Sequence, residues 1–361
     1  MATKSPQIPF CGHFNQFIKA SAAGRRLTAS GKKMAAGTIG NYRFTQKLLQ
    51  EYEEKYAITL RIQLLHKASM RTLQHEKNYW ARFFLRFSAF MYNDKKYYDN
   101  YVSGVFKILK TFFNYLQNQK GYMVGNYHKS FRIPLQQSAP VVLQPGQLQF
   151  LISNKKFQQA LNPSLKRAKD IFVVGCTVAL RFSDLMNLKK SNLVQNGSET
   201  YLTLFTQKTG TEIRIPLPDY VLEIIDRNKT KTGRYILPRL SSSNMNLQVK
   251  KLIKQAGWNH SLQKNISCRG KMKELKSKNG STWQFYQHIT THTMRRTAIT
   301  TLLMMGVPEN LVRRLSGHAP GSKEFYKYIA IAQEYMNHEI RNAFKKLMEI
   351  PAADAINNNG I

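Results

Sequence analysis

Residues 289–328, ITTHTMRRTAITTLLMMGVPENLVRRLSGHAPGSKEFYKY, concentrate side chains that could act on a phosphate ester. His292 and Arg295 are three positions apart, so on a helix they share one face, while Arg296 is turned about 100° away. A guanidinium can bind phosphate oxygens with bidentate geometry, and a phenol such as that of Tyr326 or Tyr328 can act as a nucleophile. The alternative is a helix-turn-helix with incidental basic residues, because an apolar stretch with a Gly-Val-Pro break lies between them.

The charge of the chain favours a nucleic-acid partner. The 361 residues include 55 Lys plus Arg and 20 Asp plus Glu, a formal net charge of +35. Such an excess causes self-repulsion unless a polyanion screens it. Residues 1–150 hold 22 basic and 6 acidic residues, and residues 151–361 hold 33 and 14. Both halves are therefore expected to face the same duplex. A membrane surface is the rival partner, but no long amphipathic basic helix is evident.

The remaining composition describes an intracellular globular protein. Hydrophobic residues make up 42% of the chain, and the length suggests two or three domains. Three widely separated cysteines without a C-x-x-C pair fit a reducing compartment and give no metal-binding pattern. We see no signal peptide, and no apolar run approaches the roughly 20 residues of a membrane span. We expect a cytoplasmic, nucleoid-associated protein.

The pattern along the chain predicts a mainly α protein with a small antiparallel β-sheet. Periodicity indicates helices from Thr38, as an N-cap, to about residue 56 and over 71–93, 96–119, 164–180, 218–228, 246–256 and 333–348. TYLTLFTQ and EIRIPLP, joined by Lys-Thr-Gly-Thr, predict a hairpin. The basic insertion at 262–283 is expected to be an exposed loop or hairpin.

Composition also divides the chain. Residues 133–146 contain three prolines and no charge, as in an extended linker. We therefore expect five parts: a basic N-terminal segment (1–37), a helical DNA-binding domain (38–132), the linker (133–146), a second domain (147–349) and a tail (350–361).

Three segments of the second domain together resemble the tyrosine recombinase family of phage integrases and Xer-type recombinases. They are TVALRFSDLMNL (177–188), TQKTGTEIRIPL (206–217) and the stretch with HTMRR, SGH and FYKYI. The fuller pattern looks most like integrases of Bacteroidetes-type mobile elements. The resemblance implies a catalytic domain over 147–349 and a SAM-like core-binding domain before it.

The resemblance also implies roles. Arg181 and Arg295 would bind the non-bridging oxygens of a phosphorane-like state, and Tyr328 would be the nucleophile. Lys208 on the hairpin would protonate the leaving 5′-oxygen. His292 and His318 would donate hydrogen bonds to the phosphate or handle the tyrosine proton.

Further residues have supporting roles. Asp184 would support the arginines, and Arg296, Lys271 and Lys273 would contact DNA. No metal or other cofactor is expected, because the arginines take the part that Mg²⁺ has in two-metal nucleases.

Several simpler interpretations compete with these roles. Arg181 could merely pair with Asp184, and Lys208 could be an ordinary turn lysine. Tyr326 is the rival nucleophile. It lies about 200° around a helix from Tyr328, so only one of the two can face the site. The family pattern F-x-K-Y-I selects Tyr328. A helix-turn-helix alone explains neither Arg181 nor Lys208 nor Tyr328, so the recombinase interpretation is preferred.

Three features depart from the usual pattern of the family. The segment between His318 and Tyr328 is about one residue longer than in the commonest form. Ser316 stands in place of the usual leucine before Gly-His, and Val178-Ala179 in place of Thr-Gly.

We therefore predict a site-specific tyrosine recombinase or integrase that cuts and rejoins duplex DNA at attachment sites. A homotetramer would form on DNA and work through a 3′-phosphotyrosyl link, with accessory DNA-bending or directionality factors as further candidate partners. The helix after Tyr328, with Tyr335, Ile340 and Phe344, would pack on a neighbouring protomer or, alternatively, on its own. The other functions considered are a type IB topoisomerase and a non-catalytic, sequence-specific DNA-binding protein.

Overall fold

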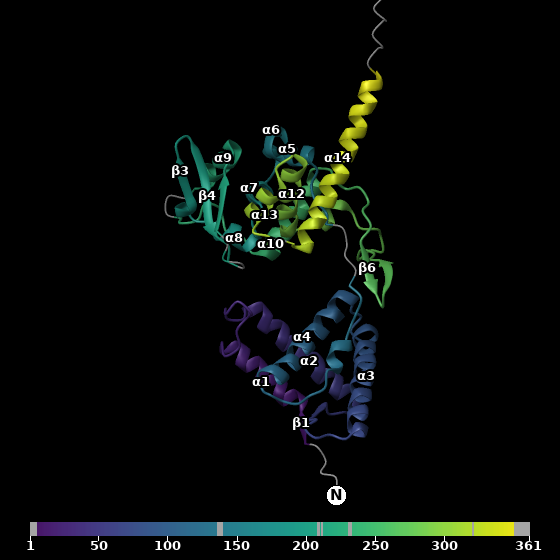
Figure 1. Cartoon of the computed structure of the whole chain (residues 1–361). Helices are drawn as coiled ribbons and strands as arrows, with labels where there is room; N and C mark the ends of the chain where they lie inside the picture. Colours follow the sequence, from purple (N-terminus) through teal and green to yellow (C-terminus); the bar gives the residue numbers. More distant parts are fainter. Residues whose placement is uncertain are drawn as a thin grey trace, which may run out of the picture. The chain divides into compact units, whose positions relative to one another are not determined.

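A computed structural model describes residues 6–135, 140–207, 210, 212–229, 233–319 and 321–349. The chain forms two compact units (Figure 1), one from Met1–Ser138 with Asn265–Leu275 and the other from Ala139–Lys264 with Lys276–Ile361. Helices dominate both, and the strands form small antiparallel sheets. The expected fold class is confirmed.

The first unit is a helical bundle with an aromatic core. Its helices are α1 (Phe10–Ala22), α2 (Ala36–Tyr56), α3 (Met70–Asn93), α4 (Asp99–Asn118) and the short 3₁₀ helix η1 (Tyr127–Ser130). The aromatic residues of α3 and α4 are largely buried. Helix α2 begins before Thr38, with Ala35 as its N-cap, so the predicted cap is wrong.

The structure differs from the expected basic segment 1–37. Phe10, Phe14 and Phe17 of α1 are fully buried in the same core as the other helices of this unit. Their spacing of four and three places them on one helix face. In the sequence, the basic stretch rich in glycine, alanine and serine that follows these phenylalanines obscured their periodicity.

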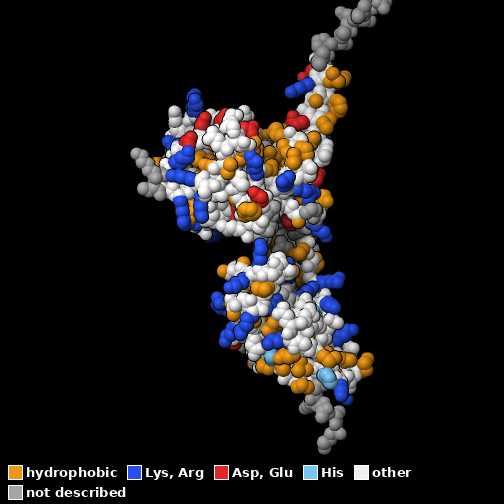
Figure 2. Space-filling model, turned by 60° about the vertical axis from the view of Figure 1, so that its left-hand side comes forward, with side chains coloured by type: hydrophobic (Ala, Val, Ile, Leu, Met, Phe, Trp, Pro, Cys, Tyr) orange, Lys and Arg blue, Asp and Glu red, His pale blue; other side chains and the backbone are white. Residues whose placement is uncertain are grey.

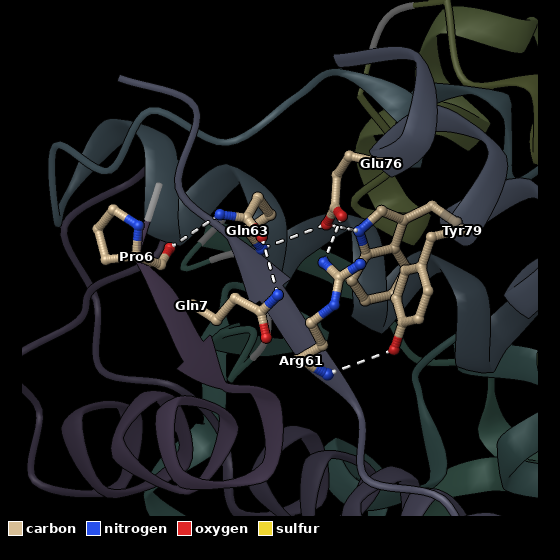
Figure 3. Close-up of polar contacts among 7 residues, drawn as sticks. Pro6, Gln7, Arg61, Gln63, Glu76 and Tyr79 are labelled. Atoms are coloured by element: carbon tan, nitrogen blue, oxygen red, sulfur yellow. Dashed lines mark hydrogen bonds and ion pairs between the residues drawn. The ribbon is translucent and has the colours of Figure 1, made fainter. Parts of the chain in front are cut away.

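The buried carboxylate of Glu76 stabilises a pair of short strands in the first unit (Figure 3). Strand β1 (Gln7–Pro9) pairs antiparallel with β2 (Arg61–Gln63). Glu76 of α3 accepts hydrogen bonds from the Gln63 backbone N–H (3.2 Å), the Trp80 indole (2.9 Å) and the Arg61 guanidinium. Because its buried oxygens are satisfied in this way, Glu76 stabilises the strand pair instead of costing desolvation energy.

The second unit contains a three-stranded sheet and a group of helices. The order along the chain is α5 (Pro145–Ser153), α6 (Lys155–Ala160), α7 (Pro163–Val178), α8 (Phe182–Met186), η2 (Lys190–Asn192), β3 (Leu193–Asn196), β4 (Glu199–Phe205), β5 (Glu212–Pro216), α9 (Asp219–Asn228), α10 (Ser242–Gln255), α11 (Phe285–His288), α12 (Thr291–Met304), α13 (Glu309–Ser316) and α14 (Lys323–Glu349). Strands β3, β4 and β5 are antiparallel neighbours in that order, so the predicted hairpin is confirmed.

A glycine lets α7 and α12 approach closely at the centre of this unit. A Cβ atom on Gly175 would lie 2.6 Å from Met294 Sδ and 3.1 Å from Leu185 Cδ2. Thr297 of α12 also accepts a hydrogen bond from the Leu143 backbone N–H at 3.0 Å. The close approach brings the end of α7 near the helix that carries Arg295.

The C-terminal helices follow the prediction in part. Helices α12 and α13 form the expected pair, with Pro308 as the N-cap of α13. Leu311 of α13 is 47% exposed, so the apolar side chains of this pair are not all buried. Helix α14 begins at Lys323, ten residues before the predicted start, so Tyr328 lies on the same continuous helix as the C-terminal residues.

The insertion at 262–283 contains a hairpin, β6 (Asn265–Cys268) and β7 (Lys271–Glu274), as predicted. Its residues belong to the first unit, although the chain on both sides belongs to the second. The expected domain 147–349 is therefore interrupted. Asp99 holds the hairpin and lies 170 positions from Arg269 in the sequence. A local sequence pattern could not predict this contact.

Asp99, at the start of α4, makes several hydrogen bonds to this hairpin. Its fully buried carboxylate accepts from the backbone N–H groups of Arg269 (2.7 Å) and Gly270 (2.9 Å), from the Ser267 hydroxyl and from the Tyr92 hydroxyl. Burial raises the pKa of Asp99, but these hydrogen bonds outweigh it and hold the pKa below its usual range.

We predict that Asp99→Ala releases the hairpin from α4. The Arg269 and Gly270 amides lose a charged acceptor, and a hydrogen bond to a charged group contributes about 1.5–3 kcal/mol. Amide exchange in residues 265–275 should accelerate at least about tenfold, as measured by hydrogen–deuterium exchange. Asp94→Ala, which removes a half-exposed carboxylate just before α4, is the matched control. Unchanged protection of residues 265–275 in Asp99→Ala would contradict the anchoring role.

Candidate functional site

The site begins where α7 ends. Ala179 follows α7 in the left-handed conformation (φ 54°), and Arg181 is the N-cap of the short helix α8. A non-glycine residue rarely takes this conformation, and it costs about 1–2 kcal/mol. The turn aims the Ala179 carbonyl at Arg295, whose Nη1 donates to it at 3.0 Å.

Arg295 is the buried centre of the site. It is 7% exposed, and its Nη2 donates to the Ser316 carbonyl at 2.5 Å. Its two backbone contacts join the end of α7 to the end of α13. Burial lowers the pKa of Arg295 to about 10, and the neighbouring Arg181 guanidinium acts in the same direction. Arg295 therefore remains charged at neutral pH.

Arg181 lies beside Arg295 and can donate a further hydrogen bond. In the part of the chain that the structure describes, Arg181 Nη1 and Asp184 Oδ2 are buried without a hydrogen-bond partner. Asp184 Oδ1 accepts from the Gln207 backbone N–H at 3.1 Å. The ion pairs found among the described residues do not include Arg181 with Asp184, so the simple pairing expected as an alternative is not formed. Two neighbouring guanidiniums with an unpaired N–H form a site suited to an anion.

His318 and Tyr328 complete the group around the arginines. The His318 and Tyr328 ring centroids are 6.0 Å apart, and Arg295 Nη2 is 3.4 Å from each ring nitrogen of His318. Burial, followed by the charges of Arg295, Arg181 and Arg313, lowers the pKa of His318 to about 4. His318 is therefore neutral at pH 7 in the DNA-free protein.

The two candidate tyrosines differ in their surroundings. Tyr328 is 8% exposed and packs with Phe325, Ile299 and the other buried residues of this cluster. Tyr326 is 54% exposed, and its ring centroid lies 5.1 Å from the Arg313 guanidinium carbon. Tyr328 is thus the tyrosine that lies beside the arginines and His318.

The remaining predicted residues that the structure describes lie on α12 and β7. His292 is exposed in the first turn of α12, one turn before Arg295, and Arg296 is half-buried on the same helix. Lys271 and Lys273 are exposed on β7, in the first unit. Lys208 lies outside the described residues.

Two residues of the site were visible in the sequence only as departures from the family pattern. Ala179 supplies the carbonyl that holds Arg295 Nη1, and Ser316 supplies the carbonyl that holds Nη2. Because both act on Arg295 through backbone atoms, their side chains gave no chemical signal.

Residues 142–335 match the Phage integrase family, whose members are tyrosine recombinases, and the chain belongs to this family. The search of curated proteins found no match. Among the described helices, none is both long and apolar enough to cross a membrane.

Solved structures share the fold. One is a lambda integrase dimer, residues 75–356, bound to a COC′ core site (16% identity, covering 89% of this chain and 95% of that chain, TM-score 0.55). Another is the XerH site-specific recombinase in a post-cleavage complex with a palindromic difH substrate (12% identity, covering 91% of this chain and 84% of that chain, TM-score 0.55). A third is the Tn1549 transposon integrase in complex with circular intermediate DNA (14% identity, covering 89% of this chain and 95% of that chain, TM-score 0.55).

We predict that Ala179→Gly stabilises the protein by up to about 1 kcal/mol. Glycine adopts positive φ without the steric cost that alanine has there, although its freedom in the unfolded chain offsets part of the gain. The measurement is the free energy of unfolding in urea. Ala168→Gly, in the regular interior of α7, should instead lose stability. Both variants remove a buried methyl group, so a loss in Ala179→Gly as large as that in Ala168→Gly would show that Ala179 is not strained.

Proposed function

We propose that this chain cuts and rejoins duplex DNA by phosphoryl transfer through Tyr328. The observation that supports the proposal is the pair of guanidiniums of Arg181 and Arg295, with a buried unpaired N–H on Arg181, beside His318 and the buried Tyr328. A scissile phosphate would supply the negative charge that this group lacks. No second function is favoured by an observation of this kind.

Each group has a defined task in the proposed step. Tyr328 Oη attacks the phosphorus, loses its proton, and forms the 3′-phosphotyrosyl bond as the bond to the 5′-oxygen breaks. Arg181 and Arg295 stabilise the added charge on the non-bridging oxygens. Asp184 orients the site near Arg181, and His292 contributes from the first turn of α12.

The leaving 5′-oxygen requires a proton. Lys208, which lies between β4 and β5 in the sequence, is our candidate donor, because a basic side chain on such a turn can reach the leaving group. The free 5′-hydroxyl would then attack the equivalent link on a partner strand. No cofactor enters this scheme.

DNA is the proposed partner of both units. The net charge of +35 is spread over the two halves of the sequence, and Lys and Arg side chains are visible on the surfaces of both units (Figure 2). Arg296 in the second unit and Lys271 and Lys273 on the hairpin are the proposed backbone contacts. The similar lambda integrase and Tn1549 integrase structures contain bound DNA.

We further propose that α14 packs on a second copy of the chain in a tetramer on DNA. The helix extends beyond the rest of its unit (Figure 1), and hydrophobic side chains run along it (Figure 2). Ile340, Phe344 and Leu347 are exposed at helical spacing on this part, whereas Tyr335 packs partly on its own unit. A lambda integrase tetramer bound to a Holliday junction has the same fold.

We predict that Tyr328→Phe abolishes the covalent protein–DNA adduct while leaving the fold intact. The substitution keeps the buried ring and removes only the attacking oxygen. The substrate is a duplex carrying the attachment site with a nick near the cleavage position. The short fragment that bears the free 5′-hydroxyl then dissociates after cleavage, and the adduct is trapped. Mass spectrometry should find the nucleotide on the peptide that contains Tyr328.

Tyr326→Phe is the matched control, since it removes an exposed hydroxyl two residues away. It should form the adduct at close to the normal rate. An adduct that persists in Tyr328→Phe and disappears in Tyr326→Phe would reverse the assignment. Relaxation of supercoiled plasmid lacking an attachment site would instead favour topoisomerase activity, and intact DNA binding without any adduct would favour a non-catalytic protein.

A further inference from the structure

Ser316 makes a side-chain contact that the usual leucine at this position could not make. It is the last residue of α13 and is fully buried. Its Oγ lies 2.8 Å from His318 Nδ1, within hydrogen-bond distance. The contact connects a buried hydroxyl directly to the histidine that faces Arg295 and Tyr328.

The direction of this hydrogen bond follows from the single hydrogen of the hydroxyl. Ser316 Oγ is also 2.7 Å from the Val312 carbonyl oxygen and 3.3 Å from that of Arg313. A carbonyl oxygen can only accept, so the hydroxyl hydrogen goes to Val312. Ser316 Oγ then accepts, and His318 Nδ1 must carry a hydrogen to donate to it. The reverse direction would leave the lone pairs of Ser316 Oγ and the Val312 carbonyl oxygen facing each other at 2.7 Å.

The charges around His318 allow only this one proton at neutral pH. Among the described residues, the charged groups that act on the ring are Arg295 of α12, Arg181 at the start of α8, Arg313 of α13 and the acid Glu324 of α14. The Tyr328 ring, also on α14, lies edge-on to the His318 ring. Together with burial, the three cations disfavour the imidazolium. With Nδ1 protonated, Nε2 of the neutral ring carries the lone pair, and Arg295 Nη2 lies 3.4 Å from it at the limit of a hydrogen bond.

We propose that Ser316 is a positioning residue that fixes His318 in the Nδ1–H tautomer, so that Nε2 accepts the proton of Tyr328. The inference rests on the proposed function. As the Tyr328 Oη–phosphorus bond forms and the bond to the 5′-oxygen breaks, the phenol proton passes to Nε2 and gives an imidazolium. The 5′-oxygen takes its own proton from a separate donor.

The bound phosphate makes this transfer feasible. In the DNA-free protein the arginines disfavour a positive charge on His318. The scissile phosphate places its negative charge against the same arginines, and that charge grows as the phosphorane-like state forms. The imidazolium therefore becomes less unfavourable at the moment when the proton must leave Tyr328.

The first test is the tautomer of His318 in the DNA-free protein. Nitrogen-15 NMR of protein labelled on the histidine ring distinguishes a protonated from an unprotonated ring nitrogen, and loss of the signals in His318→Gln assigns them. At pH 7 we expect a protonated Nδ1 and an unprotonated Nε2. A proton on Nε2, or an even mixture of tautomers, would overturn the inference. This measurement needs no enzymatic activity, so it is independent of the proposed function.

The second test is Ser316→Ala, which removes the acceptor of the Nδ1 hydrogen. We expect a mixture of tautomers and an about tenfold slower single-turnover formation of the adduct on the nicked substrate. Ser316→Thr keeps the oxygen and should restore the tautomer. Thr300→Val is the control, because it removes a buried hydroxyl of α12 that bonds only to backbone carbonyls. It should leave the His318 signals unchanged.

The outcomes separate the two proposals. A normal adduct rate in Ser316→Ala despite a mixed tautomer would overturn the role of Ser316 and leave the proposed function standing. Absence of the adduct in the unmodified protein, with the expected tautomer, would contradict the proposed function itself and with it the proton transfer to Nε2.

Discussion

Two guanidinium groups held side by side, with too little negative charge around them, are the constraint on which the catalytic unit depends. Burial and Arg181 both lower the pKa of Arg295, and Arg181 keeps a buried N–H without a partner among the described residues. Such a pair repels itself, and two backbone carbonyls hold Arg295 in place against that repulsion. In the proposed function, a substrate phosphate would relieve the repulsion, so its cost in the free protein would become selective binding of a highly charged transition state.

The fold supplies this restraint through backbone atoms. Gly175 allows α12 to approach α7, and the left-handed Ala179 turns a carbonyl toward Arg295. The end of α13 supplies the second carbonyl, from Ser316. The end of α7 and the end of α13 thus meet at the side chain of Arg295 on α12. The same α13 terminus places His318, so the position of the histidine and the position of the arginine are coupled.

The sequence predicted which residues come together better than it predicted the architecture. The proposed phosphoryl transfer uses arginine, histidine and tyrosine together, and a pattern of these three at fixed spacings is specific. Five of the predicted residues lie in one region of the second unit: Arg181, Asp184, Arg295, His318 and Tyr328. The helix at 71–93 was also predicted almost to the residue, because its aromatic periodicity is strong. Lys208 stays a prediction.

What the sequence could not predict depends on contacts between distant residues. The hairpin at 265–274 is held in the first unit by one carboxylate, Asp99, whose partners lie 168 to 171 positions away. Helix α1 was missed because it is short and runs into a stretch rich in glycine, alanine and serine, and its burial is a property of the assembled core. The role of Ser316 depends on where its hydroxyl points, which no spacing rule gives.

The central claim is tested most directly by the stability of Arg181→Met in the absence of DNA. Methionine retains much of the aliphatic volume and removes one of the two like charges. If the arginine pair is a repulsive site awaiting a phosphate, the free energy of unfolding in urea should rise by about 1 kcal/mol, while exposed Arg314→Met should leave it unchanged. A marked loss of stability in Arg181→Met would contradict the account, since it would mean that Arg181 is already satisfied by the protein alone.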